Sequence, residues 1–268
     1  MFYHNINPVL IKLGAFEIRY YGLFYAVSFI IAYFLIYHLA KQKKLDISKD
    51  DVSDLVVYII VGIILGARIV YVLFYNLGFY LSSPLEVFAV WHGGLSFHGG
   101  MIGAVISSLL FCRKKKIRFY DIADIVVFPV AIGLAIGRIG NFLNGELYGR
   151  STNSSLCIDY SRNKFLDSIP EGCRHPSQIY ESAKNILIFT SLWLLKNKRL
   201  PSGFLFWSFI TLYGALRTIA EIFRQPDARL GFIFGGFTMG QILSIPLFII
   251  GVYMLIRLKN KEKAKLAE

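Results

Sequence analysis

The sequence predicts an all-α polytopic membrane protein with seven transmembrane helices. Hydrophobic residues make up 55% of the 268-residue chain and charged residues only 17%, whereas about a quarter of a typical soluble domain is charged. Seven apolar stretches have the ~17–25 residues that a tilted helix needs to cross a bilayer. Because unpaired backbone groups are costly in hydrocarbon, each stretch is expected to be a helix.

The predicted spans follow one another along the chain. They cover residues 19–40, 55–75, 93–111, 122–143, 179–195, 203–222 and 237–256. The stretch 93–111 is rich in glycine, and 179–195 is the shortest. We therefore expect a single membrane domain over 1–268, with an outer-surface arm at 1–18, an outer loop at 144–176 and a basic cytoplasmic tail at 257–268.

Lysine and arginine residues predict the orientation of these helices. "KQKKLDISK", "RKKKIR", "KNKR" and the tail "RLKNKEKAK" are strongly basic, whereas the alternate segments 76–91, 144–176 and 223–236 are poorer in basic residues. The positive-inside rule then predicts an N-terminus outside and a C-terminus in the cytoplasm. This pattern also explains the net charge of +12, so we expect contact with membrane lipids and not with nucleic acid.

The three cysteines do not form a metal-binding pattern. Cys112 lies at the cytoplasmic end of the third span. Cys157 and Cys173 share the outer loop, where they either pair or remain free thiols. We expect neither a metal site nor a cofactor.

Three arginines lie inside or at the edge of predicted spans: Arg68, Arg138 and Arg217. An arginine at the centre of a bilayer costs on the order of 2.5–3.5 kcal/mol by insertion scales. Each side chain therefore snorkels to the surface, pairs with a carboxylate or faces a polar interior. Glu221 lies one turn after Arg217 on the same helical face, and this spacing favours an ion pair.

The predicted topology places all three arginines toward the outer leaflet. A guanidinium group binds phosphate through two parallel hydrogen bonds. The nearest phosphate in that leaflet belongs to a phospholipid. We therefore predict that the three side chains converge into a pocket for a lipid phosphate.

Two further polar stretches interrupt the apolar sequence. In "WHGGLSFHGGMIG", residues 91–103, the glycines allow close approach to a helix or a ligand. His98 in this stretch is either a candidate for acid–base chemistry or a packing residue. In "RHPSQIYES", residues 174–182, Pro176 suits the first turn of a helix. Gln178 and Glu181 then face inward or the interface, unless they belong to an ordinary polar first turn.

The stretch "GRIGNFLNGELYG" closely resembles the signature of the bacterial prolipoprotein diacylglyceryl transferases, Gly-Arg-x-Gly-Asn-Phe-x-Asn-x-Glu-x-x-Gly. It fits at every fixed position from Gly137 to Gly149. "YYGLFY", "GARIVYVLFYN", "GGLSFHGG", "HPSQIYE" and "YGALRTIAEIFR" resemble further blocks of this family in the same order. The resemblance runs from about residue 15 to 256, and the sequence departs from it mainly in the loop 150–173.

The resemblance implies a transferase of alkyl groups other than methyl. Such an enzyme moves the sn-1,2-diacylglyceryl group of phosphatidylglycerol to the lipobox cysteine thiol of a preprolipoprotein. A thioether forms and glycerol phosphate leaves, which is the first step of bacterial lipoprotein maturation. The implied partners are phosphatidylglycerol and the signal peptide that carries the lipobox. The implied location is the bacterial plasma (inner) membrane, with the active site toward the extracytoplasmic leaflet.

The resemblance also implies the site residues. Carried over by position, the catalytic residues are His98, Arg138 and Arg217. The positions implied to bind phosphatidylglycerol are Arg138, Asn141, Asn144, Glu146, Gly149, Tyr21, Arg68, Tyr213, Glu221, Arg224 and His175. The substrate supplies the nucleophile, so the enzyme needs a base to favour the thiolate. His98 is the candidate base, unless it only orients a substrate while another group or water takes the proton.

Two other function classes fit parts of the sequence. An anion transporter or channel also uses buried arginines and glycine-rich helices, but the two halves of the sequence show no inverted repeat, and the polar residues crowd one leaflet. A different phospholipid enzyme, such as a phosphatase or acyltransferase, would need a histidine nucleophile or a His-x₄-Asp block. The sequence shows neither.

Overall fold

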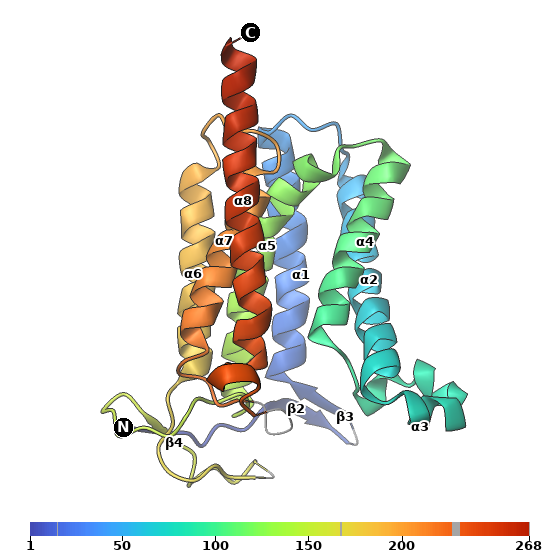
Figure 1. The fold of residues 1–268 in the computed structure, drawn as a ribbon. Helices are drawn as coiled ribbons and strands as arrows, with labels where there is room; N and C mark the ends of the chain where they lie inside the picture. Colours follow the sequence, from blue (N-terminus) through green and yellow to red (C-terminus); the bar gives the residue numbers. More distant parts are fainter. Residues whose placement is uncertain (15, 167, 227–230, 268) are drawn as a thin grey trace. The chain divides into compact units, whose positions relative to one another are not determined.

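The computed structural model describes residues 1–14, 16–166, 168–226 and 231–267, which fold mostly into α-helices (Figure 1). The helices are α1 (Tyr20–Gln42), α2 (Lys49–Tyr75), α3 (Leu77–Ser82), α4 (Phe97–Lys115), α5 (Phe119–Leu143), α6 (Ser177–Leu195), α7 (Phe204–Ala220) and α8 (Met239–Ala267). Three short 3₁₀ helices join them: η1 (Pro84–Phe88), η2 (Val90–His92) and η3 (Phe234–Gly236). All seven predicted stretches are helical over most of their length, so the predicted helical class is confirmed.

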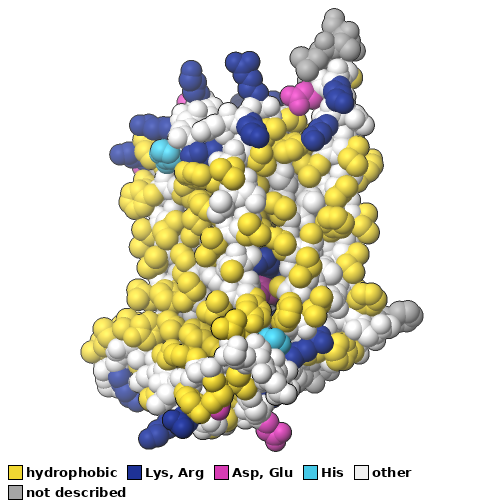
Figure 2. Space-filling view, turned by 90° about the vertical axis from the view of Figure 1, so that its left-hand side faces the viewer, with side chains coloured by type: hydrophobic (Ala, Val, Ile, Leu, Met, Phe, Trp, Pro, Cys, Tyr) yellow, Lys and Arg dark blue, Asp and Glu magenta, His cyan; other side chains and the backbone are white. Residues whose placement is uncertain are grey.

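Several helices have the length and composition of membrane spans. Within the described residues, α1, α2, α5 and α8 are long and apolar enough to cross a membrane, and α7 is a shorter apolar helix. On the face seen in Figure 2, hydrophobic side chains predominate, while Lys and Arg side chains gather near its two ends. This distribution is that of a multi-pass membrane protein.

The chain divides into two compact units. One comprises Met1–Ala32 and Ala123–Glu268, and the other Tyr33–Ile122. The larger unit therefore contains the N-terminal half of α1 together with α5, α6, α7 and α8. The smaller unit contains α2, α3 and α4.

In the smaller unit, α2 and α4 pack closely through glycines spaced four residues apart. A Cβ atom on Gly66 would lie 2.3 Å from the Gly99 carbonyl oxygen, and one on Gly103 would lie 1.9 Å from that of Gly62. Small residues at this spacing let two backbones touch, as in membrane helix pairs. Of the two possibilities that the sequence left open for these glycines, the structure thus shows close approach to another helix.

In the larger unit, a carboxylate of α5 caps the start of α7. The side chain of Asp124 is buried, and its two oxygens accept hydrogen bonds of 2.8 Å from the backbone N–H groups of Gly203 and Phe206. The first N–H groups of a helix have no partner within the helix, and a carboxylate also suits the positive end of the helix dipole. Asp124 therefore fixes where α7 begins relative to α5.

The predicted outer arm and outer loop are tied together by short strands. Strand β1 (Phe2–Tyr3) pairs in parallel with β4 (Ile158–Asp159), and β2 (Val9–Leu13) forms a hairpin with β3 (Phe16–Arg19). Cys157 and Cys173 form a disulfide, which settles the alternative between paired and free thiols. The pairing of β1 with β4 therefore joins the arm to the loop that follows α5.

Candidate functional site

The polar signature begins in the last turns of α5 and folds back on itself. Gly145, with φ +67°, adopts the left-handed conformation that commonly ends a helix. Glu146 is thereby turned toward α5. Its Oε1 accepts hydrogen bonds from Asn141 Nδ2 at 2.8 Å and from Asn144 Nδ2 at 3.3 Å. Asn141 Oδ1 in turn accepts a 3.4 Å hydrogen bond from Arg138 Nη1. Four of the predicted residues thus form one network.

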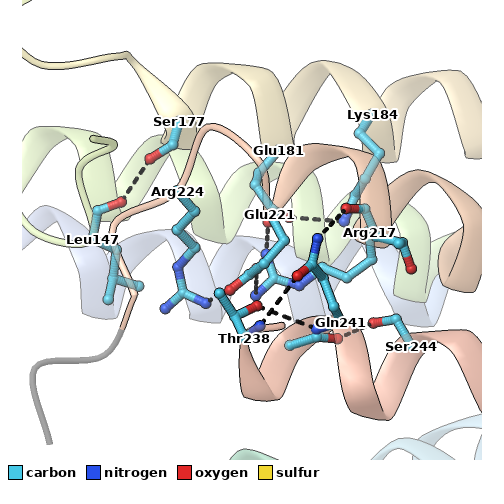
Figure 3. A network of polar contacts seen from close by, with 12 residues as sticks. Leu147, Ser177, Glu181, Lys184, Arg217, Glu221, Arg224, Thr238, Gln241 and Ser244 are labelled. Atoms are coloured by element: carbon cyan, nitrogen blue, oxygen red, sulfur yellow. Dashed lines mark hydrogen bonds and ion pairs between the residues drawn. The ribbon is translucent and has the colours of Figure 1, made fainter. Parts of the chain in front are cut away.

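The first turn of α6 holds this signature in place. Gln178 Nε2 donates to the Glu146 carbonyl at 2.7 Å, and Ser177 Oγ donates to the Leu147 carbonyl at 2.9 Å (Figure 3). Gln178 Nε2 also lies 3.3 Å from the Tyr160 hydroxyl, and burial raises the pKa of that phenol to about 12. The start of α6 therefore turns its polar groups inward, toward the signature.

Glu181, one turn further along α6, is the centre of a buried ion cluster. Its carboxylate forms an ion pair with Arg217 Nη1 of α7 and lies 3.8 Å from Arg138 Nε of α5. Lys184 Nζ lies 2.7 Å from Glu181 Oε2. The Glu181 side chain is only 3% exposed, so its charge is compensated by these cations and not by water.

The cluster continues through Glu221 toward the end of α7. Arg217 Nη2 lies 2.8 Å from Glu221 Oε2, which confirms the predicted ion pair, and Arg224 Nη1 lies 3.8 Å from the same oxygen. A Cβ atom on Gly240 of α8 would lie 2.7 Å from the Glu221 carboxyl carbon, so a larger residue there would displace this carboxylate. Figure 3 shows Glu181, Lys184, Arg217 and Glu221 gathered between α6, α7 and α8.

A cavity of about 470 Å³ adjoins the signature. Its charged lining consists of Arg19, Glu146 and Arg224, and Asn144 and Tyr148 contribute further polar groups. A site with both signs of charge and amide donors suits a polar, anionic headgroup. The predicted residues Asn144, Glu146 and Arg224 therefore share one cavity wall.

Gly149 and His175 meet where three backbone segments cross. Gly149 N donates to the His175 carbonyl at 2.9 Å, and an isolated antiparallel bridge joins Gly149 to Arg224. A Cβ atom on Gly149 would lie 2.6 Å from both the His175 and the Phe223 carbonyl oxygens. Close packing therefore requires glycine at position 149. The bridge from Gly149 to Arg224 holds Arg224 near the signature.

Two predicted tyrosines contact the cluster's helices. Tyr21 of α1 packs on α5, since a Cβ atom on Gly140 would lie 3.0 Å from its Cδ2, and its hydroxyl lies 3.0 Å from that of Tyr25. The ring of Tyr213 on α7 lies 4.5 Å below the Lys184 ammonium. Both tyrosines therefore lie against helices that carry the cluster.

Arg68 and His98 lie in the smaller unit and have different surroundings. All five N–H donors of Arg68 are directed at backbone carbonyls of residues 86–94: those of Val87, Gly93, Gly94, Glu86 and Ala89. Its charge is thus compensated by the loop that precedes α4, and neither snorkelling nor a carboxylate is needed. Among the described residues, none forms a hydrogen bond with the His98 imidazole, which is partly exposed.

Two members of the cluster, Glu181 and Lys184, are not among the site residues that the sequence predicted. For Glu181 the sequence left open an inward position, the interface or an ordinary polar first turn, and for Lys184 it predicted nothing. The available signal was two charges one turn apart within a predicted span, at a depth where unpaired charge is costly. Among the described residues, no group of three or more His, Cys, Asp or Glu side chains could hold a metal ion.

Comparison with known proteins decides the family. The sequence matches the profile described as "Prolipoprotein diacylglyceryl transferase" over residues 8–257. The chain belongs to the prolipoprotein diacylglyceryl transferase family. A relative from Geobacter sulfurreducens is 43% identical over 98% of this chain and 99% of its own length.

Two further relatives of the family agree. One from Legionella pneumophila (strain Paris) is 43% identical over 94% of this chain and 97% of its own length. One from Rickettsia conorii is 40% identical over 97% of this chain and 100% of its own length. All three carry the name phosphatidylglycerol–prolipoprotein diacylglyceryl transferase. The family resemblance deduced from the sequence is therefore confirmed.

Proposed function

We propose that this protein transfers the sn-1,2-diacylglyceryl group of phosphatidylglycerol to the lipobox cysteine of preprolipoproteins. The names of its relatives support this activity. The observation that carries the proposal is the meeting of Arg138 and Arg217 at Glu181, inside apolar helices and beside the signature. Buried guanidinium groups suit a phosphate that remains attached to lipid.

The proposed reaction needs no nucleophile from the enzyme. The substrate's thiolate sulfur forms a bond to the glycerol carbon, and the bond between that carbon and the phosphate oxygen breaks. Glycerol phosphate leaves with the electron pair of the broken bond, and the thiol proton passes to a base. Cationic groups beside the phosphate stabilise the charge that develops on this leaving group. We assign that task to Arg138 and Arg217.

The remaining groups have supporting roles in this proposal. Asn141, Asn144 and Glu146 hold the glycerol headgroup by hydrogen bonds, because they already form a preorganised polar network. His98 is the proposed base, or the group that orients the substrate. Its imidazole has no hydrogen bond to another described residue, so it remains available to a ligand.

We also propose the membrane arrangement that the sequence predicted. The chain crosses the bacterial inner membrane seven times, with the N-terminus outside and the C-terminus in the cytoplasm. The distribution of basic residues supports this orientation. Within the larger unit, Arg138 lies near the end of α5 that leads into the loop 144–176, so the active site faces the extracytoplasmic leaflet.

A mass measurement tests the proposed reaction. Purified protein in detergent is given phosphatidylglycerol and a synthetic lipobox peptide, and the peptide's mass is followed. We expect a diacylglyceryl adduct on the peptide and release of glycerol phosphate. A matched peptide with serine in place of cysteine should stay unmodified. Anion flux through protein-containing liposomes without any adduct would instead favour a transporter and refute the proposal.

A further inference from the structure

Lys184 is a buried cation to which neither the signature nor the proposed reaction gives a role. It lies in the middle of α6 and is 7% exposed. Its Nζ lies 2.7 Å from Glu181 Oε2 and 4.5 Å from the centre of the Tyr213 ring. A lysine at this depth in an apolar helix is costly unless its charge serves the surrounding groups.

The two oxygens of Glu181 are divided among three cations. Oε1 forms the ion pair with Arg217, whereas Oε2 faces both Lys184 and Arg138. Lys184 lies at 2.7 Å, within hydrogen-bond distance, but Arg138 Nε lies at 3.8 Å, beyond it. An arginine without a competitor normally approaches a carboxylate to about 2.7–2.9 Å through two parallel bonds. Lys184 therefore occupies the oxygen that Arg138 would otherwise bind.

The cluster also carries an excess of positive charge. Four cations, Arg138, Lys184, Arg217 and Arg224, contact two carboxylates, those of Glu181 and Glu221. Among the four, the Arg138 side chain is the most exposed, at 19%. Buried like charges repel strongly in a medium of low dielectric constant. An anion beside Arg138 would relieve this repulsion.

We propose that Lys184 is a positioning residue: by occupying Glu181 Oε2, it keeps the Arg138 guanidinium available for the phosphate of phosphatidylglycerol. This inference rests on the proposed function, because it names the same lipid and the same site. It predicts that Lys184 acts on lipid affinity through Arg138, without touching the lipid. Removing Lys184 lets Arg138 close on Glu181.

The first test separates affinity from turnover. Lys184→Met should raise the KM for phosphatidylglycerol about tenfold or more, since one charge-assisted hydrogen bond to the phosphate is worth roughly that much. Bound lipid draws Arg138 from Glu181 back to the phosphate, so the cost falls on binding and kcat should change far less. Lys198→Met removes an exposed lysine just beyond the same helix and should leave KM unchanged. A Lys184→Met variant with unchanged KM would overturn the inference.

The second test asks whether Glu181 is the reason for the effect. In Lys184→Met/Glu181→Gln, the carboxylate that captures Arg138 is gone, so KM should fall back toward the wild-type value. A merely structural role for Lys184 predicts a double variant as poor as the single variant, or worse. That result would overturn the inference even if the single variant folded badly.

The inference can fail separately from the proposed function. If the wild-type protein gives no peptide adduct, the proposed reaction is wrong, but binding of phosphatidylglycerol can still be measured as a Kd in detergent. The same pattern of weakened binding in the single variant and recovered binding in the double variant is expected. Equal Kd values in all three proteins would contradict the role of Lys184, and absence of wild-type binding would contradict both proposals.

Discussion

Arg68 and Arg138 lie in two different environments. Arg68 is surrounded by backbone carbonyls that accept from all of its N–H groups. Arg138 has one long hydrogen bond to Asn141 and a 3.8 Å approach to Glu181. A ligand anion would have to displace the existing partners of Arg68, whereas it could bind Arg138 directly. Depth in the membrane alone therefore does not distinguish the role of Arg68 from that of Arg138.

Arg138→Lys tests the need for a two-pronged contact with phosphate. Lysine keeps the charge but presents a point charge in place of a planar fork. We expect the transfer rate to fall roughly tenfold to a hundredfold, corresponding to the loss of one charge-assisted hydrogen bond. The rate is measured with the lipobox peptide at several lipid concentrations. A variant as active as the wild type would argue strongly against phosphate binding by Arg138.

A buried histidine joins the arm to the signature. His4 Nε2 lies 2.7 Å from the Phe142 carbonyl, and Asn163 Nδ2 lies 2.6 Å from His4 Nδ1. The Asn163 side-chain oxygen already accepts a hydrogen bond from Phe165 N at 2.8 Å. The side-chain amide therefore cannot flip without losing that bond. The ring packs on Tyr160, 4.8 Å away between centroids. This geometry fits a neutral imidazole with its proton on Nε2.

His4 therefore predicts a pH dependence of stability. Burial lowers the pKa of the His4 imidazole from 6.5. The contribution of His4 to stability is complete at a pH above the pKa of this histidine in the unfolded chain. It is lost as the pH falls below that pKa, because the unfolded chain then binds a proton more readily than the folded protein does. Between about pH 7.5 and 5.5, the melting temperature of the wild type should fall more than that of His4→Gln. Parallel curves for the two proteins would contradict this prediction.

At the scale of single elements, the start of α7 depends on a residue of another helix. Asp124→Ala removes both acceptors for the Gly203 and Phe206 N–H groups. Loss of a helix cap costs about 0.5–2 kcal/mol, so the melting temperature should fall, and Asp124→Asn should have a smaller effect. Asp50→Asn, at an exposed position in the first turn of α2, is the matched control. Equal stability of Asp124→Ala and the wild type would show that the cap is dispensable.

The contact between α2 and α4 depends on its glycines. Even the methyl group of Gly103→Ala would lie 1.9 Å from a backbone oxygen of α2, so the helices must separate. Overpacking of this kind typically costs about 1–3 kcal/mol. Gly78→Ala is the control, since a Cβ atom there meets nothing within 4 Å. Thermal unfolding of both variants in one detergent should show a lower melting temperature for Gly103→Ala only. A lower melting temperature for Gly78→Ala than for Gly103→Ala would contradict the packing.

The helices and the ion pair of Arg217 with Glu221 could be predicted because their causes lie close together in the sequence. Apolar length predicts a span, and a spacing of one turn predicted the pair of Arg217 and Glu221. The cap that Asp124 forms and the ion pairs of Glu181 with Arg138 and Arg217 could not be assigned in this way, since these partners lie on other helices. The carbonyls around Arg68 could not be predicted either, because a sequence does not show which backbone groups surround a side chain.

At the scale of the whole molecule, the disulfide should matter for the outer loop and not for the chemistry. Cys157 and Cys173 close a loop with a sequence separation of 16, and cross-links of this size typically contribute about 2–4 kcal/mol. Replacing both with serine should make the loop 144–176 more sensitive to protease while the transfer rate stays largely intact. Complete loss of transfer would show that this loop takes part in the reaction.

The charges of the whole chain fall into two groups with different roles. Lysines and arginines outside the helices' apolar stretches set the proposed orientation, whereas we propose that the six charged side chains of the buried cluster form the lipid site. Only the second group justifies the cost of placing charge at membrane depth. We therefore propose that Arg138 and Arg217 bind one lipid phosphate.

A cryo-electron microscopy structure of the protein in nanodiscs of phosphatidylglycerol tests that claim most directly. We predict a lipid phosphate within hydrogen-bond distance of the guanidinium groups of both Arg138 and Arg217, with its glycerol headgroup against Asn144 and Glu146. A headgroup bound elsewhere, with Arg138 and Arg217 contacting only protein groups, would contradict the account.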